Sequence, residues 1–175
     1  MTNARMSIRL FSLVSSAVLV LIATSMFTTY RIARPGFDIT DRKSSASTQE
    51  IVKALETLAN YSELIGFDSF AATCLGSAGL ILGQEPTKTD QSVATARNYL
   101  EKSVALGESL AIETGNFNLA LESRFSLGLF LNDIGHKEES INHLRETLKW
   151  AKNNSPSSYW IANIERAIRA ISKSA

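Results

Sequence analysis

The sequence predicts an all-α protein, and three observations lead to this prediction. From residue 47 onward, apolar residues recur every three or four positions, which is the period of a helix with one buried face. Capping residues, glycines and a proline divide these segments into lengths typical of globular helices. No segment alternates apolar and polar residues at the two-residue period of a strand. The chain has 175 residues, 45% of them hydrophobic, and is long enough to bury one core.

The N-terminal part departs from this pattern and predicts a membrane anchor. Residues 1–9 form a short basic tail, and residues 10–30 contain no charged side chain. About 20 predominantly apolar residues span a bilayer, so we expect residues 10–30 to form a transmembrane helix or signal-anchor. Basic residues flank this stretch on both sides, namely Arg5, Arg9, Arg31 and Arg34.

Other interpretations of the N-terminus remain open. Ala23-Thr24-Ser25 has the small residues of a signal-peptide cleavage site, and cleavage there would release a secreted or periplasmic protein. A mitochondrial presequence is a third interpretation, although the stretch is too uniformly apolar to be amphipathic. The count of Lys and Arg slightly favours a cytoplasmic domain, whereas a short basic tail before a signal-anchor favours export. These two arguments nearly cancel, and our working expectation is a bacterial inner-membrane protein with its domain in the periplasm.

The C-terminal part divides into a linker and a helical domain. Residues 31–46 predict a polar linker with a Pro35-Gly36 break, and residues 47–175 predict the domain. Its first helix opens with a capping box formed by Ser47 and Glu50, and Gly66 ends it. The second helix covers about 67–82 and is nearly uncharged, but its length fits a buried core helix better than a second span.

Four more helices follow, which gives about six in the domain. A polar loop precedes a long helix that Gly115 ends, and Gly135 separates the next two helices. Ser155 is expected to cap the last helix, with Pro156 in its first turn. The four helices are expected over about 91–113, 117–134 and 137–152, and from 155 onward.

Two pairs of glycines have the same spacing, although glycine within a helix costs about 1 kcal/mol relative to alanine. In each pair a Leu-Gly dipeptide is followed by a second glycine seven residues later: Leu75-Gly76 with Gly83, and Leu127-Gly128 with Gly135. We expect Gly76 and Gly128 to allow close helix crossings. We expect Gly83 and Gly135 to end their helices as left-handed caps.

This pattern resembles the tetratricopeptide repeat, whose first helix carries Leu-Gly and whose second helix carries small and aliphatic residues at fixed offsets. The corresponding second-helix residues are Ala96, Leu100 and Ser103 in the earlier unit and Ser140, Leu144 and Thr147 in the later one. The match is partial. Ala72 and Arg124 stand where the family has tryptophan, and the two units are 52 residues apart, more than the family's period of about 34.

The resemblance implies a concave protein-binding surface lined by the first helix of each unit. The family's offsets place on it Phe70, Thr73, Ser77, Leu80 and Ile81 from the earlier unit, and Glu122, Phe125, Leu129, Asn132 and Asp133 from the later one. This face is apolar with an acidic edge, which suits a helix or an apolar segment of a partner protein. The other interpretation is that these residues pack against a neighbouring helix.

The sequence shows no signature of a catalytic or metal site. The net charge of +1 does not indicate a nucleic-acid partner. His136 follows a turn glycine and predicts a solvated helix start, and His143 predicts a surface residue. The single cysteine, Cys74, predicts a small buried side chain. One thiol and two histidines lack the spacing of a metal site, so we expect no enzyme activity, no metal and no cofactor.

The sequence thus predicts a membrane-anchored protein–protein interaction module, acting as an accessory, assembly or scaffold subunit of an integral membrane complex. The alternative is a secreted or periplasmic soluble adaptor after signal-peptide cleavage. An enzyme with an unrecognised helical active site is a distant third.

Overall fold

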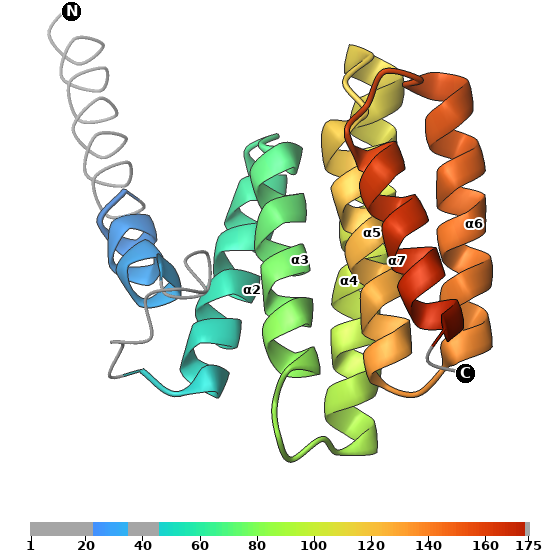
Figure 1. Cartoon of the computed structure of the whole chain (residues 1–175). Helices are drawn as coiled ribbons and strands as arrows, with labels where there is room; N and C mark the ends of the chain where they lie inside the picture. The colour runs from blue at the N-terminus through green and yellow to red at the C-terminus, as the bar shows by residue number, and fades with distance from the viewer. Residues whose placement is uncertain (1–22, 35–45, 174–175) are drawn as a thin grey trace, which may run out of the picture.

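The computed structural model describes residues 23–34 and 46–173, and every element in this part of the chain is a helix (Figure 1), which confirms the all-α prediction there. Residues 23–34 are helical. Six helices follow, as expected: α2 (Thr48–Leu64), α3 (Asp68–Gly83), α4 (Asp90–Thr114), α5 (Asn118–Asp133), α6 (Lys137–Asn154) and α7 (Trp160–Lys173). Residues 1–9 and the first part of the predicted anchor, 10–22, lie outside the described residues. None of the helices among the described residues is both long and apolar enough to cross a bilayer.

Local capping signals explain where α2 and α4 begin. The Ser47 hydroxyl accepts a hydrogen bond from the Glu50 backbone N–H, and the Glu50 carboxylate accepts one from the Ser47 N–H at 2.8 Å. This is the predicted capping box. Thr89 and Ser92 form a second one at the start of α4, with reciprocal distances of 2.9 and 3.1 Å.

Glycines explain where three of the helices end. Gly66, Gly115 and Gly135 follow α2, α4 and α5 with φ values of 75°, 71° and 86°. Side chains strongly disfavour this left-handed region, so glycine fits these turns best. After α5, the His136 N–H donates to the Leu131 carbonyl at 2.9 Å, which satisfies one of the last carbonyls of the helix.

Two boundaries differ from the sequence-based expectation. The last helix begins at Trp160 and not at Ser155, because residues 155–159 form a turn in which the Ser158 N–H donates to the Ser155 carbonyl at 2.9 Å. Residues 31–34, expected to start the linker, continue the first helix up to the residue before Pro35.

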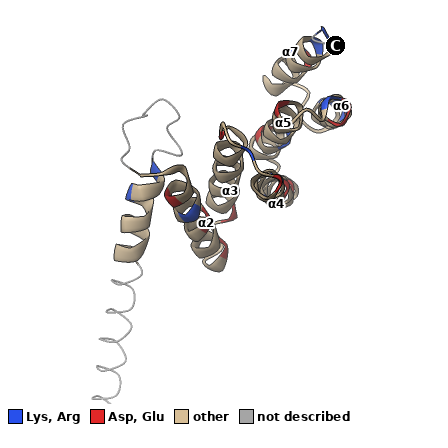
Figure 2. Ribbon diagram, turned by 90° about the horizontal axis from the view of Figure 1, so that it is seen from below, with Lys and Arg blue, Asp and Glu red and all other residues tan. Residues whose placement is uncertain are grey.

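The helices form two layers. Each helix from α2 to α6 packs against the next in the chain, and α5 also contacts α3 and α7. Thus α3, α5 and α7 lie side by side, with α2, α4 and α6 behind them, as the end-on view shows (Figure 2). This arrangement of antiparallel pairs is compatible with a helical-repeat fold.

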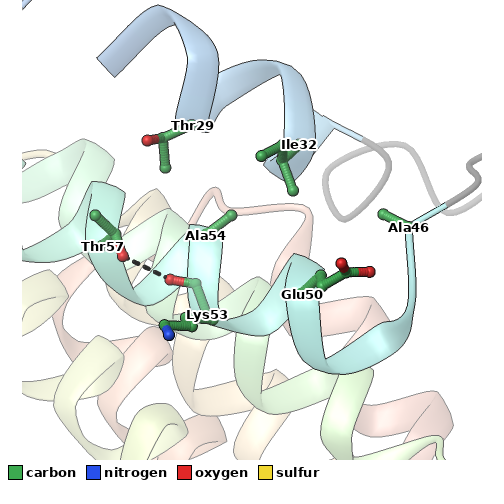
Figure 3. Close-up of a pocket in the computed structure, with 7 residues that line it drawn as sticks. All are labelled: Thr29, Ile32, Ala46, Glu50, Lys53, Ala54 and Thr57. Carbon is green, nitrogen blue, oxygen red and sulfur yellow. Dashed lines mark hydrogen bonds between the residues drawn. The ribbon is translucent and has the colours of Figure 1, made fainter. Parts of the chain in front are cut away.

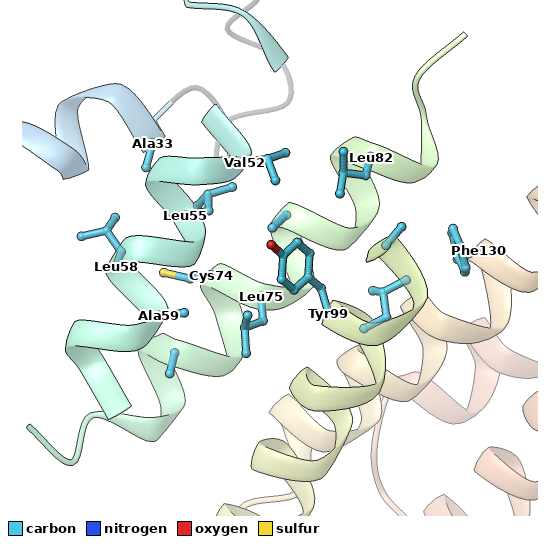
Figure 4. Packing of buried hydrophobic residues seen from close by; sticks show 14 of the residues in the cluster. Ala33, Val52, Leu55, Leu58, Ala59, Cys74, Leu75, Leu82, Tyr99 and Phe130 are labelled. Atoms are coloured by element: carbon cyan, nitrogen blue, oxygen red, sulfur yellow. The ribbon is translucent and has the colours of Figure 1, made fainter. Parts of the chain in front are cut away.

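The core consists of two clusters of buried apolar residues that share α5. The first joins α2, α3, α4 and part of α5, and includes Leu55, Leu58 and Leu100 (Figure 4). Ala33, which is fully buried, ties the first helix into this cluster. The second joins α5, α6 and α7 around Leu144 and Ile164.

Glycines allow close crossings between helices at four positions. A Cβ atom at Gly128 would lie 2.5 Å from Leu144 Cδ2 of α6, and one at Gly79 would lie 2.7 Å from Leu100 Cγ of α4. Gly79, rather than Gly76, therefore occupies the place in the earlier unit that Gly128 occupies in the later one. At Gly76 the nearest atom is the Ser103 hydroxyl oxygen, at 3.1 Å. Gly107 approaches the backbone of Ala120 in the same way, at 3.0 Å.

Gly83 does not act as the expected left-handed cap. It lies in the last turn of α3, and its φ is not positive. A Cβ atom there would lie 2.7 Å from the ring of Phe130 in α5. Its lack of a side chain therefore makes room for Phe130 between α3 and α5.

Candidate functional site

A small hollow between α3 and α5 is the candidate site. It has a volume of about 60 Å³ and lies on the layer formed by α3, α5 and α7. From α3 it is lined by Thr73, Ser77 and Leu80, and from α5 by Leu119, Glu122 and Ser126. Small side chains dominate this lining. Glu122 is exposed and is the one carboxylate among the lining residues.

Hydroxyl groups at the floor of the hollow connect three helices. Ser103 of α4 donates to the Ala72 carbonyl of α3 at 2.8 Å, and its oxygen lies 2.9 Å from the Ser123 hydroxyl of α5. Ser103 and Ser123 are both buried, so each needs such a partner. The contact joins α3, α4 and α5 beneath the hollow and holds the spacing of its walls.

The residues predicted on α3 divide between the hollow and the core. Ser77 and Leu80 line the hollow, as does Thr73. Phe70, Leu80 and Ile81 are half-buried and pack against the first core cluster. The structure therefore brings three of the five α3 residues predicted on the concave face, Thr73, Ser77 and Leu80, to one site. α3 carries a single charged residue, Asp68, and is almost uniformly tan in Figure 2.

The residues predicted on α5 are more dispersed. Phe125 packs against Trp160 of α7, with ring centroids 5.4 Å apart, so α7 covers the predicted position of Phe125 on the concave face. Leu129 and Asn132 are half-buried. Asp133 is exposed, and its carbonyl accepts a hydrogen bond from Lys88 of the α3–α4 loop at 3.3 Å. None of these four residues lines the hollow, whereas Glu122 does.

Sequence reasoning missed several lining residues, namely Leu119, Ser126, Ser103 and Ser123. Leu119, Glu122 and Ser126 are three and four residues apart and so share one face of α5. That spacing, taken from Glu122, could have identified the other two. Ser103 has no comparable signal, because its position depends on how α4 packs beneath α3 and α5.

Arg124 of α5 contacts residues of two neighbouring helices. Its guanidinium forms an ion pair with Glu108 of α4 and lies over the ring of Trp150 of α6, 5.1 Å from the centroid. The side chain is 19% exposed, so this pair is only partly screened by solvent. The contacts with Glu108 and Trp150 thus join α5 to α4 and α6.

His143 lies between α5 and α6 and is not the surface residue that was expected. It is half-buried, and its Nε2 lies 2.9 Å from the Arg124 carbonyl oxygen. Burial lowers the pKa of His143, while the hydrogen bond to that carbonyl acts in the opposite direction. The imidazole therefore joins two helices. His136 is exposed at the start of α6, as expected, and its ring nitrogen lies 3.1 Å from Glu139.

The single cysteine, Cys74, lies in the core. Cys74 is fully buried, and burial raises the pKa of its thiol to about 12. A thiol with so high a pKa is a poor nucleophile. No group of three or more His, Cys, Asp or Glu residues within residues 23–34 and 46–173 could hold a metal ion.

A larger cavity, of about 420 Å³, lies between the first helix and α2 (Figure 3). Two of its polar side chains are engaged in local helix contacts. Glu50 caps α2, and the Thr57 hydroxyl donates to the Lys53 carbonyl at 2.8 Å. The apolar part of its lining comes from Ile32, Ala46 and Ala54.

Comparison with known proteins found no similarity. No protein-family model matches the sequence, and neither a curated protein nor a solved structure matches it.

Proposed function

We propose that this chain is a membrane-anchored protein–protein interaction module of the tetratricopeptide-repeat type, an accessory or scaffold subunit of a membrane complex. The observation that carries the proposal is the hollow between α3 and α5, which opens on the layer where repeat proteins of this kind bind their partners. The repeated Leu-Gly pattern supports the repeat type. The uncharged residues 10–30 support the membrane anchor.

The size of the hollow favours a macromolecular partner. Small-molecule sites typically enclose about 300–1,000 Å³, whereas this hollow has about 60 Å³. That volume suits one side chain of a partner segment. Leu80 and Leu119 would contact an apolar side chain. Glu122 at the rim would favour a basic or amide group beside it.

The proposed partner segment is therefore a helix or extended stretch with one small apolar side chain next to a hydrogen-bond donor. The lining contains no Lys, Arg or Asn side chain to pair with a terminal carboxylate, and Glu122 would repel one. This excludes the carboxylate clamp of the chaperone-binding members of the family as the model for binding here.

The test is co-purification of the full-length chain from gently solubilised membranes, followed by mass spectrometry. The informative variant is Ser126→Trp, which would fill the hollow from its rim without changing the buried Ser103–Ser123 contact. The matched control is Ala105→Trp, on an exposed position of α4. We expect the Ser126→Trp variant to recover at least tenfold less partner than the wild type. The Ala105→Trp variant should recover as much partner as the wild type.

Two outcomes would contradict the proposal. Equal recovery of partners with both variants would mean that the hollow does not bind them. Recovery of a soluble chain that begins near Met26 would favour the alternative, a secreted or periplasmic adaptor. Extraction of the membranes with carbonate separates these cases, because a retained anchor resists it.

A further inference from the structure

Five of the exposed large apolar side chains lie at one end of the helical domain. Among the described residues eight such side chains are exposed, and three of them, Phe27, Tyr30 and Ile32, belong to the first helix. The other five lie at the turns that follow α2, α4 and α6, and they are Leu64, Ile65, Phe67, Ile112 and Tyr159. None lies at the opposite turns, α3–α4 and α5–α6, where those residues are described.

The fold places these three turns together. Because the helices alternate in direction, the C-terminal ends of α2, α4 and α6 lie at the same end of the domain, at the top in Figure 1. The first helix is described from residue 23 onward. The residues that precede it, 10–22, are uncharged in the sequence.

The apolar residues at this end are strongly exposed. Leu64 is 81% exposed, Phe67 is 61% exposed and Ile112 is 83% exposed. Leu64, Ile65 and Phe67 are adjacent in the α2–α3 turn, separated only by Gly66. Single exposed apolar residues are ordinary, but three in one turn, with others confined to the same end, indicate a surface that is covered in the working protein.

The first helix connects this end to the anchor. Ala33 is fully buried in the cluster that includes Leu55 and Leu58 of α2. The predicted anchor ends at residue 30, so only two residues separate it from Ala33, which is packed on the domain. A domain attached so closely stays at the bilayer surface, and weak apolar contacts then suffice to orient it.

We propose that the α2–α3 turn and the C-terminal end of α4 rest on the lipid surface beside the anchor, with Leu64, Ile65, Phe67 and Ile112 inserted among the headgroups. Tyr159 at the α6–α7 turn has the amphipathic ring that favours the same interface. This inference depends on the membrane anchor in the proposed function but not on the partner or its hollow.

Charge identifies the kind of lipid. Glu63, Asp68 and Glu113 lie at the same end as the apolar residues, and anionic headgroups would repel them. The basic Lys152 near the end of α6 is paired with Glu165 at 2.9 Å. The contact is therefore driven by apolar insertion and is strongest on neutral, zwitterionic lipid.

The experiment uses the full-length chain reconstituted in phosphatidylcholine vesicles that contain nitroxide-labelled lipids. A fluorophore is attached through Leu64→Cys or Ile112→Cys, and through Thr87→Cys in the α3–α4 turn as the matched control. The native Cys74 is buried and would remain unlabelled. Flotation of the chain with the vesicles shows, independently of the label, whether the anchor holds the chain in the membrane.

We expect the nitroxides to quench the labels at 64 and 112 several-fold more than the label at 87. Replacing Leu64, Ile65 and Phe67 together by serine should reduce quenching at 112 while the melting temperature stays unchanged. Equal quenching at all three positions in a chain that floats with the vesicles would overturn the inference and leave the anchor standing. Labels at 64 and 112 that are shielded from water but not quenched by the nitroxide lipids would also overturn the inference. A second copy or another protein would then cover this end.

A comparison of lipids tests the mode of contact. Vesicles with anionic phosphatidylglycerol should give weaker quenching at low salt than neutral vesicles. Stronger quenching on anionic vesicles would contradict a contact driven by apolar insertion. A chain that fails to float would refute the anchor and this inference together.

Discussion

Gly128 of α5 faces Leu144 of α6 so closely that a Cβ atom at Gly128 would lie 2.5 Å from Leu144 Cδ2 and 2.7 Å from Cγ. Leu144 is fully buried and has little room to move. The pair therefore fixes the distance between the two helices. The sequence predicted a close helix crossing at Gly128, and this contact is that crossing.

The first prediction is that Gly128→Ala destabilises the protein by about 1–3 kcal/mol, because overpacking displaces Leu144. From sequence alone, alanine would be nearly tolerated, since it has the higher helix propensity. Gly128→Leu should be worse still. The measurement is the free energy of unfolding from chemical denaturation.

A double-mutant cycle identifies the cause. Leu144→Ala leaves space at the crossing, so adding Gly128→Ala in that background should cost clearly less than it does in the wild type. Additive effects would mean that Gly128 acts through something other than Leu144.

A second prediction separates Phe125 from Leu129. Phe125 packs against Trp160 of α7, and Leu129 is half-buried without a ring partner in the described structure. We expect Phe125→Ser to lower stability by about 1–3 kcal/mol, less than for a fully buried phenylalanine. Leu129→Ser should cost less. Equal thermal melts for the two variants would contradict the docking of α7 on Phe125.

The third prediction concerns pH and His143. Burial lowers the pKa of His143 in the folded protein below its usual value of 6.5, so the unfolded chain binds the proton more readily. The stability that depends on neutral His143 is therefore complete above about pH 6.5 and declines as the pH falls toward the lowered pKa. Melting temperatures between pH 7.5 and 5 measure this decline.

His143→Gln is the control for that pH dependence. Glutamine can still donate a hydrogen bond to the Arg124 carbonyl but does not titrate. The decline between pH 6.5 and 5 should become shallower in this variant. An unchanged decline would assign it to other groups.

The fourth prediction concerns Cys74. Its thiol is fully buried and its pKa is raised to about 12, from 9.0 for an ordinary thiol. At pH 8 the thiolate fraction should be lower by roughly a thousandfold than in an exposed cysteine. Alkylation should therefore be slow in the native protein and fast in denaturant. Rapid alkylation under native conditions would mean that α2 and α3 separate readily.

Local signals in the sequence predicted most element boundaries. The Ser47–Glu50 capping box and the turn glycines at 66, 115 and 135 act within a few residues, so they can be identified without knowledge of the fold. The predicted start of α7 at Ser155 was wrong. Ser155 and Pro156 also suit a turn, and a turn forms there.

Close contacts between helices were harder to predict. Gly83 has the same spacing from Gly76 as Gly135 has from Gly128, but it accommodates Phe130 and does not end a helix by a left-handed turn. Gly79 and Gly107 were not identified, because their roles depend on which residue of another helix faces them. For the same reason, only part of the lining of the candidate site could be predicted. Offsets within α3 identified Ser77 and Leu80, whereas Ser103 requires the placement of a third helix.

The division of the core into two clusters that share α5 bears on how the protein unfolds. Leu127, Phe130 and Leu131 of α5 belong to the cluster with α2, α3 and α4, whereas Leu121 and Phe125 pack with α6 and α7. Helices that interact mainly with their neighbours in the chain can separate in stages. Loss of the α6–α7 contacts would leave the first cluster assembled, with the Leu121 side of α5 uncovered. Amide hydrogen exchange should then show two levels of protection, with the amides of α6 and α7 exchanging before those of α3 and α4.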